Sequence, residues 1–148
     1  MTRVYLDTSV FSAYHDSRLP ERQRQTRAFW RRRAEFELAT SELAREELQQ
    51  VLDPARRRSV LALLTKTAVH PVTAAMTELM GRYLGEGVFT ASMRNDALHV
   101  AVAVLMRQDV LVSWNFRHLV NRQRRARIHE VNAAWGLPVI EIVAPPEL

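Results

Sequence analysis

The chain has 148 residues, of which 47% are hydrophobic and 25% charged, a composition typical of an ordinary globular protein. It contains no cysteine, which excludes a disulfide framework, a thiolate zinc site and a cysteine nucleophile. The net charge of +5 comes almost wholly from arginine, since Lys66 is the only lysine; this suits a nucleic-acid partner, although a codon bias would explain it equally well. We expect one domain over residues 1–148.

The sequence shows no sign of membrane targeting or of a nucleotide-binding loop. The apolar run before Asp7 is too short to be a signal peptide, and the longest apolar stretch, residues 100–106, is too short to span a membrane. Only four glycines occur, and none forms a phosphate-binding loop. We therefore expect a cytoplasmic protein that does not contact the membrane, and we disfavour a nucleotide-triphosphate or dinucleotide fold.

Short apolar segments alternate with helical patterns along the chain. Strands are predicted at residues 4–6, 36–40, 68–70 (weakly), 110–112 and 139–143. Helices are predicted at residues 8–14, 20–35, 41–52, 54–64, 73–84, 97–106 and 122–135. This alternation predicts an α/β sandwich of three layers, in which helices cover both faces of a parallel sheet of four to five strands.

Capping residues and breakers mark several of the predicted helix boundaries. Thr8 or Ser9 is expected to cap the first helix, and Asp96 the sixth. The Asp53-Pro54 pair ends one helix and opens the next, because proline suits a first turn.

Acidic and amide side chains follow the predicted strands. Asp7 comes directly after the first strand, Asn115 just after strand 110–112, and Glu46 and Glu47 in the helix after the second strand, while Asp96 begins a helix. Ligands bind beyond the carboxyl ends of strands in open parallel sheets. If strands 4–6 and 110–112 are neighbours, these oxygens converge, and such hard ligands suit Mg²⁺ or Mn²⁺ rather than zinc.

Each of these residues has an ordinary structural explanation when taken alone. Asp7 and Asp96 are good helix caps, and Glu46 and Glu47 suit a solvated first turn. Only the joint pattern favours a site.

Four short motifs resemble those of the PIN-domain family, in the family's order. They are residues 6–11 (Leu-Asp-Thr-Ser-Val-Phe), 41–48 (Ser-Glu-Leu-Ala-Arg-Glu-Glu-Leu), 95–101 (Asn-Asp-Ala-Leu-His-Val-Ala) and 111–116 (Leu-Val-Ser-Trp-Asn-Phe). The resemblance implies a PIN-like sandwich and Mg²⁺- or Mn²⁺-dependent cleavage of RNA. Many small bacterial members are VapC-like toxins, so it also implies a small antitoxin protein as partner and a homodimer.

The resemblance assigns the acidic positions one at a time. Asp7 matches the first and Asp96 the third, and these two would hold the metal. The second is Glu47, with Glu46 as the near alternative and Glu42 a weaker one. The fourth is commonly aspartate, but Asn115 stands here, which removes one negative charge and predicts one firmly bound cation with a weaker or absent second.

The implied mechanism is hydrolysis by water rather than attack by the ribose 2′-hydroxyl. Glu47 would orient or deprotonate the water, and Thr8, Ser9 and Ser113 would hydrogen-bond the carboxylates or a phosphate. His99 is expected to be a satisfied, partly buried histidine rather than a general acid. Trp114 could stack on a base, although a core role is the commoner one for tryptophan.

Arginine clusters give the chain its positive charge. The arginines between residues 122 and 127 lie nearest the expected site and are the best candidates for contacts with an RNA backbone, whereas residues 31–33 and 56–58 are expected to be solvated helix faces. A PIN-like RNA-binding module with an impaired site stays open as the alternative, because Asn115 would also suit a decayed site.

Two phosphoryl-transfer families fit the sequence poorly. A haloacid-dehalogenase-like phosphatase needs a second aspartate where Ser9 stands and a lysine late in the chain. A receiver-like module needs a lysine after a late strand, and Lys66 is wrongly placed.

Overall fold

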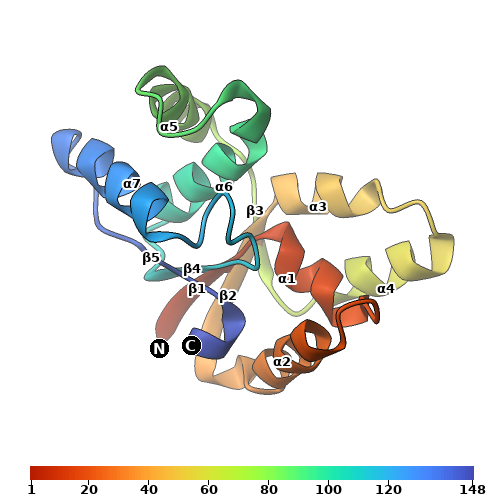
Figure 1. Cartoon of the computed structure of the whole chain (residues 1–148). Helices are drawn as coiled ribbons and strands as arrows, with labels where there is room; N and C mark the ends of the chain where they lie inside the picture. Colours follow the sequence, from red (N-terminus) through yellow and green to blue (C-terminus); the bar gives the residue numbers. More distant parts are fainter.

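A single parallel sheet lies at the centre of the computed structural model, which describes all 148 residues (Figure 1). The strand order is β3-β2-β1-β4-β5. The five strands are β1 (Thr2–Leu6), β2 (Phe36–Ser41), β3 (Ala68–His70), β4 (Val110–Val112) and β5 (Glu141–Val143). The prediction of a parallel α/β sheet is confirmed, and β1 does pair with β4, which places Leu6 beside Val112.

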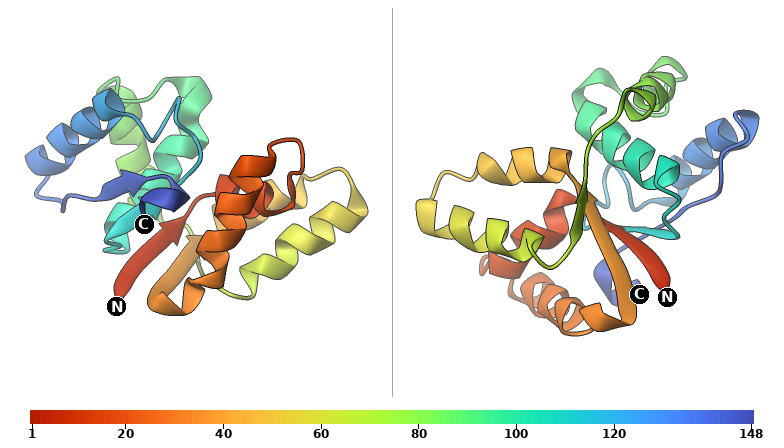
Figure 2. Two further views of the ribbon diagram at one scale, coloured as in Figure 1. Left: turned by 60° about the horizontal axis from the view of Figure 1, so that its bottom comes forward. Right: turned by 180° about the vertical axis from the view of Figure 1, so that it is seen from behind.

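Helices cover both faces of the sheet in two groups (Figures 1 and 2). One group comprises α1 (Thr8–Ser12), α2 (Pro20–Arg31), α3 (Glu42–Gln49) and α4 (Pro54–Leu64). The other comprises α5 (Ala74–Gly85), α6 (Arg94–Leu105) and α7 (Arg122–Ala134). Four short 3-10 helices complete the chain, at Ala13–His15, Arg33–Glu35, Ala91–Met93 and Pro145–Glu147.

Alternate side chains of the central strands supply two separate hydrophobic clusters. Tyr5 and Leu111 pack with α5, α6 and α7 on one face, and Val4, Leu6 and Val112 pack with α1 to α4 on the other. All five are completely buried. The period-2 alternation of a strand thus joins both layers through β1 and β4. The apolar face of α5, including Met76 and Tyr83, belongs to the first cluster.

Several predicted boundaries differ from the structure. The N-cap of α1 is Asp7, whose side chain accepts from the Ser9 amide, and not Thr8 or Ser9. Asp96 lies inside the first turn of α6, whose N-cap is Met93. Helix α1 therefore begins at Thr8, one or two residues before a Thr8 or Ser9 cap would start it, and α6 begins at Arg94, three residues before an Asp96 cap would start it.

The remaining differences lie at the ends of elements. The helix predicted over 41–52 ends at Gln49, because Asp53 must be extended before Pro54. Helix α2 stops at Arg31 and is followed by a 3-10 turn. The last strand begins at Glu141, because Val139 is exposed and outside the sheet. None of the helices combines the length and apolar character needed to span a membrane.

Candidate functional site

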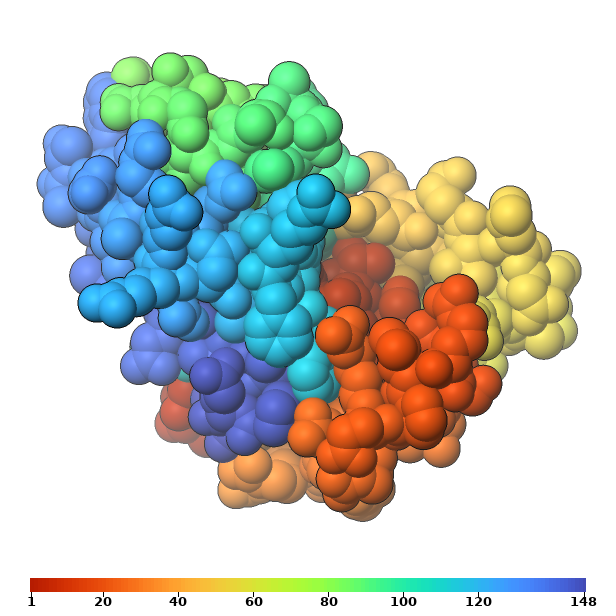
Figure 3. Space-filling model, in the orientation of Figure 1, coloured from red at the N-terminus to blue at the C-terminus, as the bar shows by residue number.

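The carboxyl ends of β1, β2 and β4 meet at one edge of the sheet, and the predicted site residues gather there. Figure 3 shows the N-terminal segment (red) at the bottom of a hollow, between the segment near residue 116 (cyan-blue) and α3 (yellow-orange). Asp7 extends β1 by one residue, since its amide donates to the Val112 carbonyl at 3.2 Å. This pairing fixes the backbone from which the Asp7 carboxylate projects.

Asp7 is buried, with 5% of its surface exposed, and both of its oxygens accept hydrogen bonds. Oδ1 accepts from the Ser9 amide at 3.0 Å and the Ser9 hydroxyl at 2.5 Å, and Oδ2 accepts from the Ser113 hydroxyl at 2.8 Å. Burial raises the pKa of the Asp7 carboxyl, although the charge of His99 and the two hydroxyls act in the opposite direction. Asp7 is therefore a rigidly held carboxylate.

Glu47 on α3 is tied to a buried polar chain that runs back into the sheet. Its Oε1 accepts from the Thr8 hydroxyl at 2.8 Å and lies 2.6 Å from His99 Nε2. The other ring nitrogen of His99 lies 2.7 Å from the Tyr5 hydroxyl, which in turn contacts Ser41 Oγ at 2.8 Å. The structure therefore turns Glu47 toward the edge, whereas Glu46 is exposed and makes no side-chain hydrogen bond or ion pair there.

The pKa values of His99 and Glu47 are shifted in opposite directions, each toward the charged form. Burial opposes a charged His99 ring, but its hydrogen bond to Glu47 and the charges of Glu47, Asp7 and Asp96 together raise the pKa of His99. Partial burial likewise opposes the charge of Glu47, but His99 and Thr8 outweigh it and lower the pKa of Glu47. All three carboxylates thus act on one buried histidine. His99 is satisfied by its partners, as the sequence predicted, and more deeply buried than expected.

Asp96, Asn115 and His118 form the other side of the site. Asp96 Oδ2 lies 2.8 Å from His118 Nδ1, and Oδ1 accepts from the Asn115 amide nitrogen at 3.4 Å. The Asn115 amide oxygen accepts from the His118 backbone N–H at 2.9 Å. The amide oxygen of Asn115 is therefore engaged by its own turn, and it is the NH₂ group that faces Asp96.

Ser9 and Ser113 connect the turn after β4 to the end of β1 by hydrogen bonds. Besides holding Asp7, the Ser9 hydroxyl accepts from the Trp114 amide at 2.9 Å. The Ser113 hydroxyl accepts from the Asn115 amide at the same distance. Trp114 itself is buried, and its indole N–H donates to Thr26 at 2.8 Å, so it belongs to the packing and is not a platform for a base.

The sequence prediction did not identify His118 or Tyr5 as parts of this site. His118 lies three residues after Asn115, and its spacing from Asn115 is the only signal in the sequence that could have indicated it. Tyr5 lies inside the first strand, where its hydroxyl is indistinguishable in sequence from an ordinary core aromatic.

The donor set fits a hard divalent cation that keeps part of its water shell. No three acidic or histidine side chains form a ready-made cage. Mg²⁺, however, is commonly held by one or two carboxylates together with water and substrate phosphate. Asp7 and Asp96 supply such carboxylates, and the second oxygen of Glu47 is free of the contacts that hold its Oε1.

Comparison with solved structures shows that known proteins share this fold. Solved structures share the fold: VapBC2 from Rickettsia felis, bound to a promoter DNA fragment (12% identity, TM-score 0.59, 97% of this chain and 98% of that chain), and DNA-bound VapBC from Salmonella typhimurium (18%, 0.58, 98% and 99%). A third is VapC20 from Mycobacterium tuberculosis, a sarcin-ricin loop cleaving toxin (17%, 0.62, 93% and 98%).

Sequence comparison gives the family directly. Among curated protein sequences, no significant match is found. The PIN domain profile matches residues 4–118, a range that includes β1, α3, the start of α6 and the turn after β4. Because the match covers most of the chain and all of the candidate site, this protein belongs to the PIN domain family.

Proposed function

We propose that this protein is a metal-dependent endoribonuclease that acts as the toxin of a toxin–antitoxin pair. The observation that carries the proposal is the gathering of Asp7, Glu47 and Asp96 around His99 at the carboxyl edge of the sheet. Burial and hydrogen bonding hold these carboxylates in place in advance, as catalysis by positioned charge requires.

Each residue has a role that follows from its contacts. Asp7 and Asp96 would hold Mg²⁺ or Mn²⁺, with Ser9 and Ser113 fixing the Asp7 oxygens. When bound, the cation would neutralise the scissile phosphate and stabilise the charge that develops in the transition state. Glu47, kept ionised by His99, would orient the attacking water and accept its proton. Thr8 holds Glu47 and not a phosphate.

Asn115 would contribute by its hydrogen bond to Asp96 and not as a ligand. The neutral amide leaves the site with three carboxylates, which supports one firmly bound cation. The same observation favours the alternative function, a catalytically impaired PIN-like RNA-binding module, because that module also needs no complete ligand set.

Partners are proposed from the solved relatives. Two of them are complexes named VapBC, and a third, VapC20, is named as a sarcin-ricin loop cleaving toxin. We propose a small antitoxin protein, an RNA substrate and a homodimer for this chain as well.

Cleavage of RNA by the purified chain, free of other proteins, tests the function. Wild type should cut a labelled RNA with Mg²⁺ or Mn²⁺ and not in EDTA, and D7N and D96N should each lower the rate by about 100-fold or more. Glu47→Gln should lower it similarly, whereas Glu46→Gln, the matched change on the exposed side of α3, should not.

Three outcomes would contradict the proposal. Metal-dependent cleavage that survives both D7N and D96N would remove these carboxylates from the mechanism. A 2′,3′-cyclic phosphate at the product ends would show attack by the ribose and not by water. RNA binding without cleavage under any metal would support the binding module instead.

A further inference from the structure

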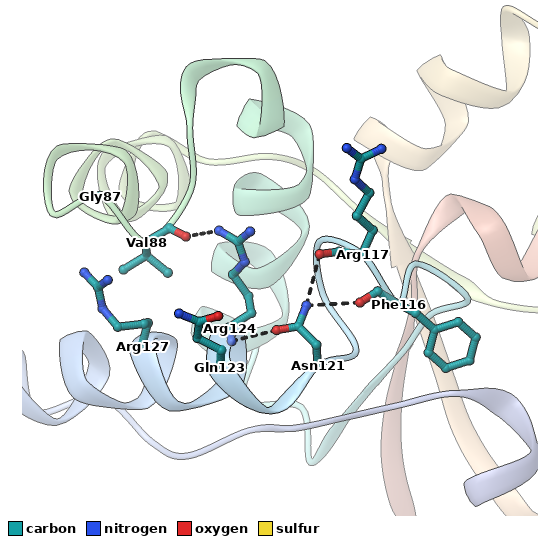
Figure 4. A pocket seen from close by; sticks show the side chains of 8 residues that line it. All are labelled: Gly87, Val88, Phe116, Arg117, Asn121, Gln123, Arg124 and Arg127. Atoms are coloured by element: carbon teal, nitrogen blue, oxygen red, sulfur yellow. Dashed lines mark hydrogen bonds between the residues drawn. The ribbon is translucent and has the colours of Figure 1, made fainter.

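A basic pocket adjoins the candidate site and takes no part in it. It has a volume of about 480 Å³, within the range of about 300–1,000 Å³ typical of ligand sites. It is lined by Gly87, Val88, Phe116, Arg117, Asn121, Gln123, Arg124 and Arg127 (Figure 4). Three arginines and no acidic residue line it, so the pocket is suited to an anion.

The pocket is built onto the same turn as the candidate site. Asn121 caps α7 by accepting from the Arg124 amide at 2.8 Å, and its NH₂ group donates to the carbonyls of Phe116 and Arg117 at 3.0 and 3.1 Å. Phe116 and Arg117 stand between Asn115 and His118, both of which contact Asp96. A chain bound at Asp96 would thus reach the pocket with no intervening element.

The arginines keep donors free for a ligand. Arg124 donates to the Val88 carbonyl and lies over the Phe89 ring at 4.8 Å. Arg127 donates to the Glu86 carbonyl at 2.9 Å, and its Nε lies 3.7 Å from the exposed Glu130 carboxylate, a loose surface pair that a phosphate can displace. A guanidinium has five N–H donors, so these contacts orient the two side chains without exhausting them. Figure 4 shows Arg117 turned away from both, on the side of α3, and Arg117 is exposed.

Phe116 adds an aromatic surface at the end of the pocket away from Arg127 (Figure 4). Phe116 is 48% exposed, a high value for phenylalanine. Trp114 meets it edge-on at 6.1 Å between ring centroids, and the Arg22 guanidinium lies 5.8 Å from its centroid. The ring is therefore held by its neighbours while much of it faces solvent.

Basic side chains beside an exposed, supported aromatic ring are the combination that binds single-stranded nucleic acid, with phosphates on the arginines and bases on the ring. We infer that the basic pocket beside the candidate site binds a backbone phosphate of single-stranded RNA. Phe116 would stack on a base next to the scissile phosphate, which lies at Asp7 and Asp96. This inference rests on the proposed function for the position of the scissile phosphate. Duplex RNA would offer Phe116 no unpaired base, so single strands are preferred.

Binding of a fluorescent 12-nucleotide single-stranded RNA, measured in EDTA so that no cleavage occurs, tests the inference. Arg117→Ala and Arg124→Gln should each weaken binding and reduce the slope of log Kd against log salt by about 0.7 for each phosphate that is no longer neutralised by an arginine. Arg124→Gln removes the charge while keeping a polar side chain that can still donate hydrogen bonds. Phe116→Ala should weaken binding by about tenfold and leave the salt slope unchanged.

Arg125→Ala is the matched control. Arg125 belongs to the group between residues 122 and 127 that the sequence favours for RNA contact, but the structure separates it from the pocket. It donates to the backbone carbonyl of Ile142 at 2.9 Å and does not line the pocket. Its loss should leave RNA affinity and salt slope unchanged. Equal weakening by Arg125→Ala and Arg124→Gln would overturn the inference, because the effect would then be one of net charge alone.

The remaining outcomes separate the pocket from the catalytic proposal. If wild type cleaves RNA and the pocket variants bind it normally, the pocket inference fails and the nuclease stands. If wild type cleaves nothing but the pocket variants lose affinity as described, the nuclease fails and the subsite stands. Tighter binding of the duplex, or of a poly-glutamate peptide that displaces the RNA, would overturn the inference.

Discussion

Asn115 has both ends of its side-chain amide engaged. The oxygen must face the His118 N–H, which can only donate, so the NH₂ group is directed at Asp96. An aspartate at this position would keep the hydrogen bond from His118 and lose the one to Asp96. It would also place a carboxylate next to that of Asp96, whose only other partner is the His118 ring.

Asn115→Asp should therefore have opposite effects with and without metal. In EDTA we expect the free energy of unfolding to fall by about 1–2 kcal/mol, from the lost hydrogen bond and the like charges. With Mn²⁺ the added charge should raise metal affinity and reverse that loss. Calorimetric titration with Mn²⁺ and thermal unfolding with and without it measure both effects, and unchanged metal affinity would show that this position does not influence the cation.

The His99–Glu47 pair predicts a pH window for stability in EDTA. Glu47 has a lowered pKa. Its contribution to the free energy of unfolding is therefore complete above the ordinary pKa of 4.5 and is lost as the pH falls through the lowered pKa. His99 has a raised pKa. Its contribution to the free energy of unfolding is therefore complete below the ordinary pKa of 6.5 and is lost as the pH rises through the raised pKa. Both contributions are complete between these ordinary values.

Glu47→Gln should reveal that window. The difference in melting temperature between wild type and E47Q is expected to be largest at pH 5–6 and to shrink on either side. Melting curves in EDTA from pH 3.5 to 9 give the profile, with Glu46→Gln as control because Glu46 is the neighbouring glutamate of α3 and is exposed. A difference that is constant across this range would mean that the pair is not ionic.

Secondary elements were predictable where local patterns act alone. The Asp53-Pro54 pair places the start of α4, and the all-apolar segment 110–112 matches β4 residue for residue. The start of α6 was not predictable, and for α1 the sequence offered Asp7, Thr8 and Ser9 as caps without deciding between them, because the first hydrogen bond of each helix is set by tertiary context. Pairing of Asp7 with Val112 makes Asp7 the cap of α1, and the preceding 3-10 turn starts α6 at Arg94.

Helices α6 and α7 end in the same way with different residues. In each, the backbone N–H of the third residue after the helix donates to the carbonyl of the third-last helical residue, at 3.0 Å from Gln108 to Ala103 and 2.8 Å from Leu137 to Asn132. The residue before it is left-handed: Arg107 has φ of 55° after α6, and Gly136 has φ of 65° after α7. This motif favours glycine, because a side chain is strained at positive φ.

Exchanging these two residue types should shift stability in opposite directions. Arg107→Gly should stabilise the protein by about 0.5–1 kcal/mol, since Arg107 is exposed and loses only its strain. Gly136→Ala should destabilise it by about 1 kcal/mol, through the backbone alone, because a Cβ there would meet no atom within 4 Å. Urea unfolding of both variants measures the pair; destabilisation by Arg107→Gly would show that its side chain contributes more than its strain costs.

The whole molecule brings residues 7, 47, 96 and 115 to one edge, and this convergence was predictable because parallel strands end together. The orientation of each side chain was not. Which glutamate of α3 faces the edge, which end of the Asn115 amide meets Asp96, and the part played by His118 all depend on packing between distant segments. The pocket beside the site arises in the same way, from a loop after α5 meeting the start of α7.

That the chain is one domain stays a prediction, and the shared strands give a way to test it. Tyr5 and Leu111 face one layer of helices while Leu6 and Val112 face the other, so neither layer can keep its sheet if the other unfolds. We expect a single cooperative transition in which the loss of a side chain on one face is felt on both.

Tryptophan fluorescence can follow the α1–α4 layer by itself. Trp30 packs on Phe11 and Trp114 bonds to Thr26 of α2, whereas Trp135 lies past the end of α7, so Trp135→Phe leaves reporters on one side only. In that background, Leu111→Ala on the opposite face should cost about 2–5 kcal/mol. The urea midpoint should fall equally by fluorescence and by far-UV circular dichroism. If the urea midpoint measured by fluorescence is unchanged while the midpoint measured by circular dichroism falls, the two layers fold as independent units.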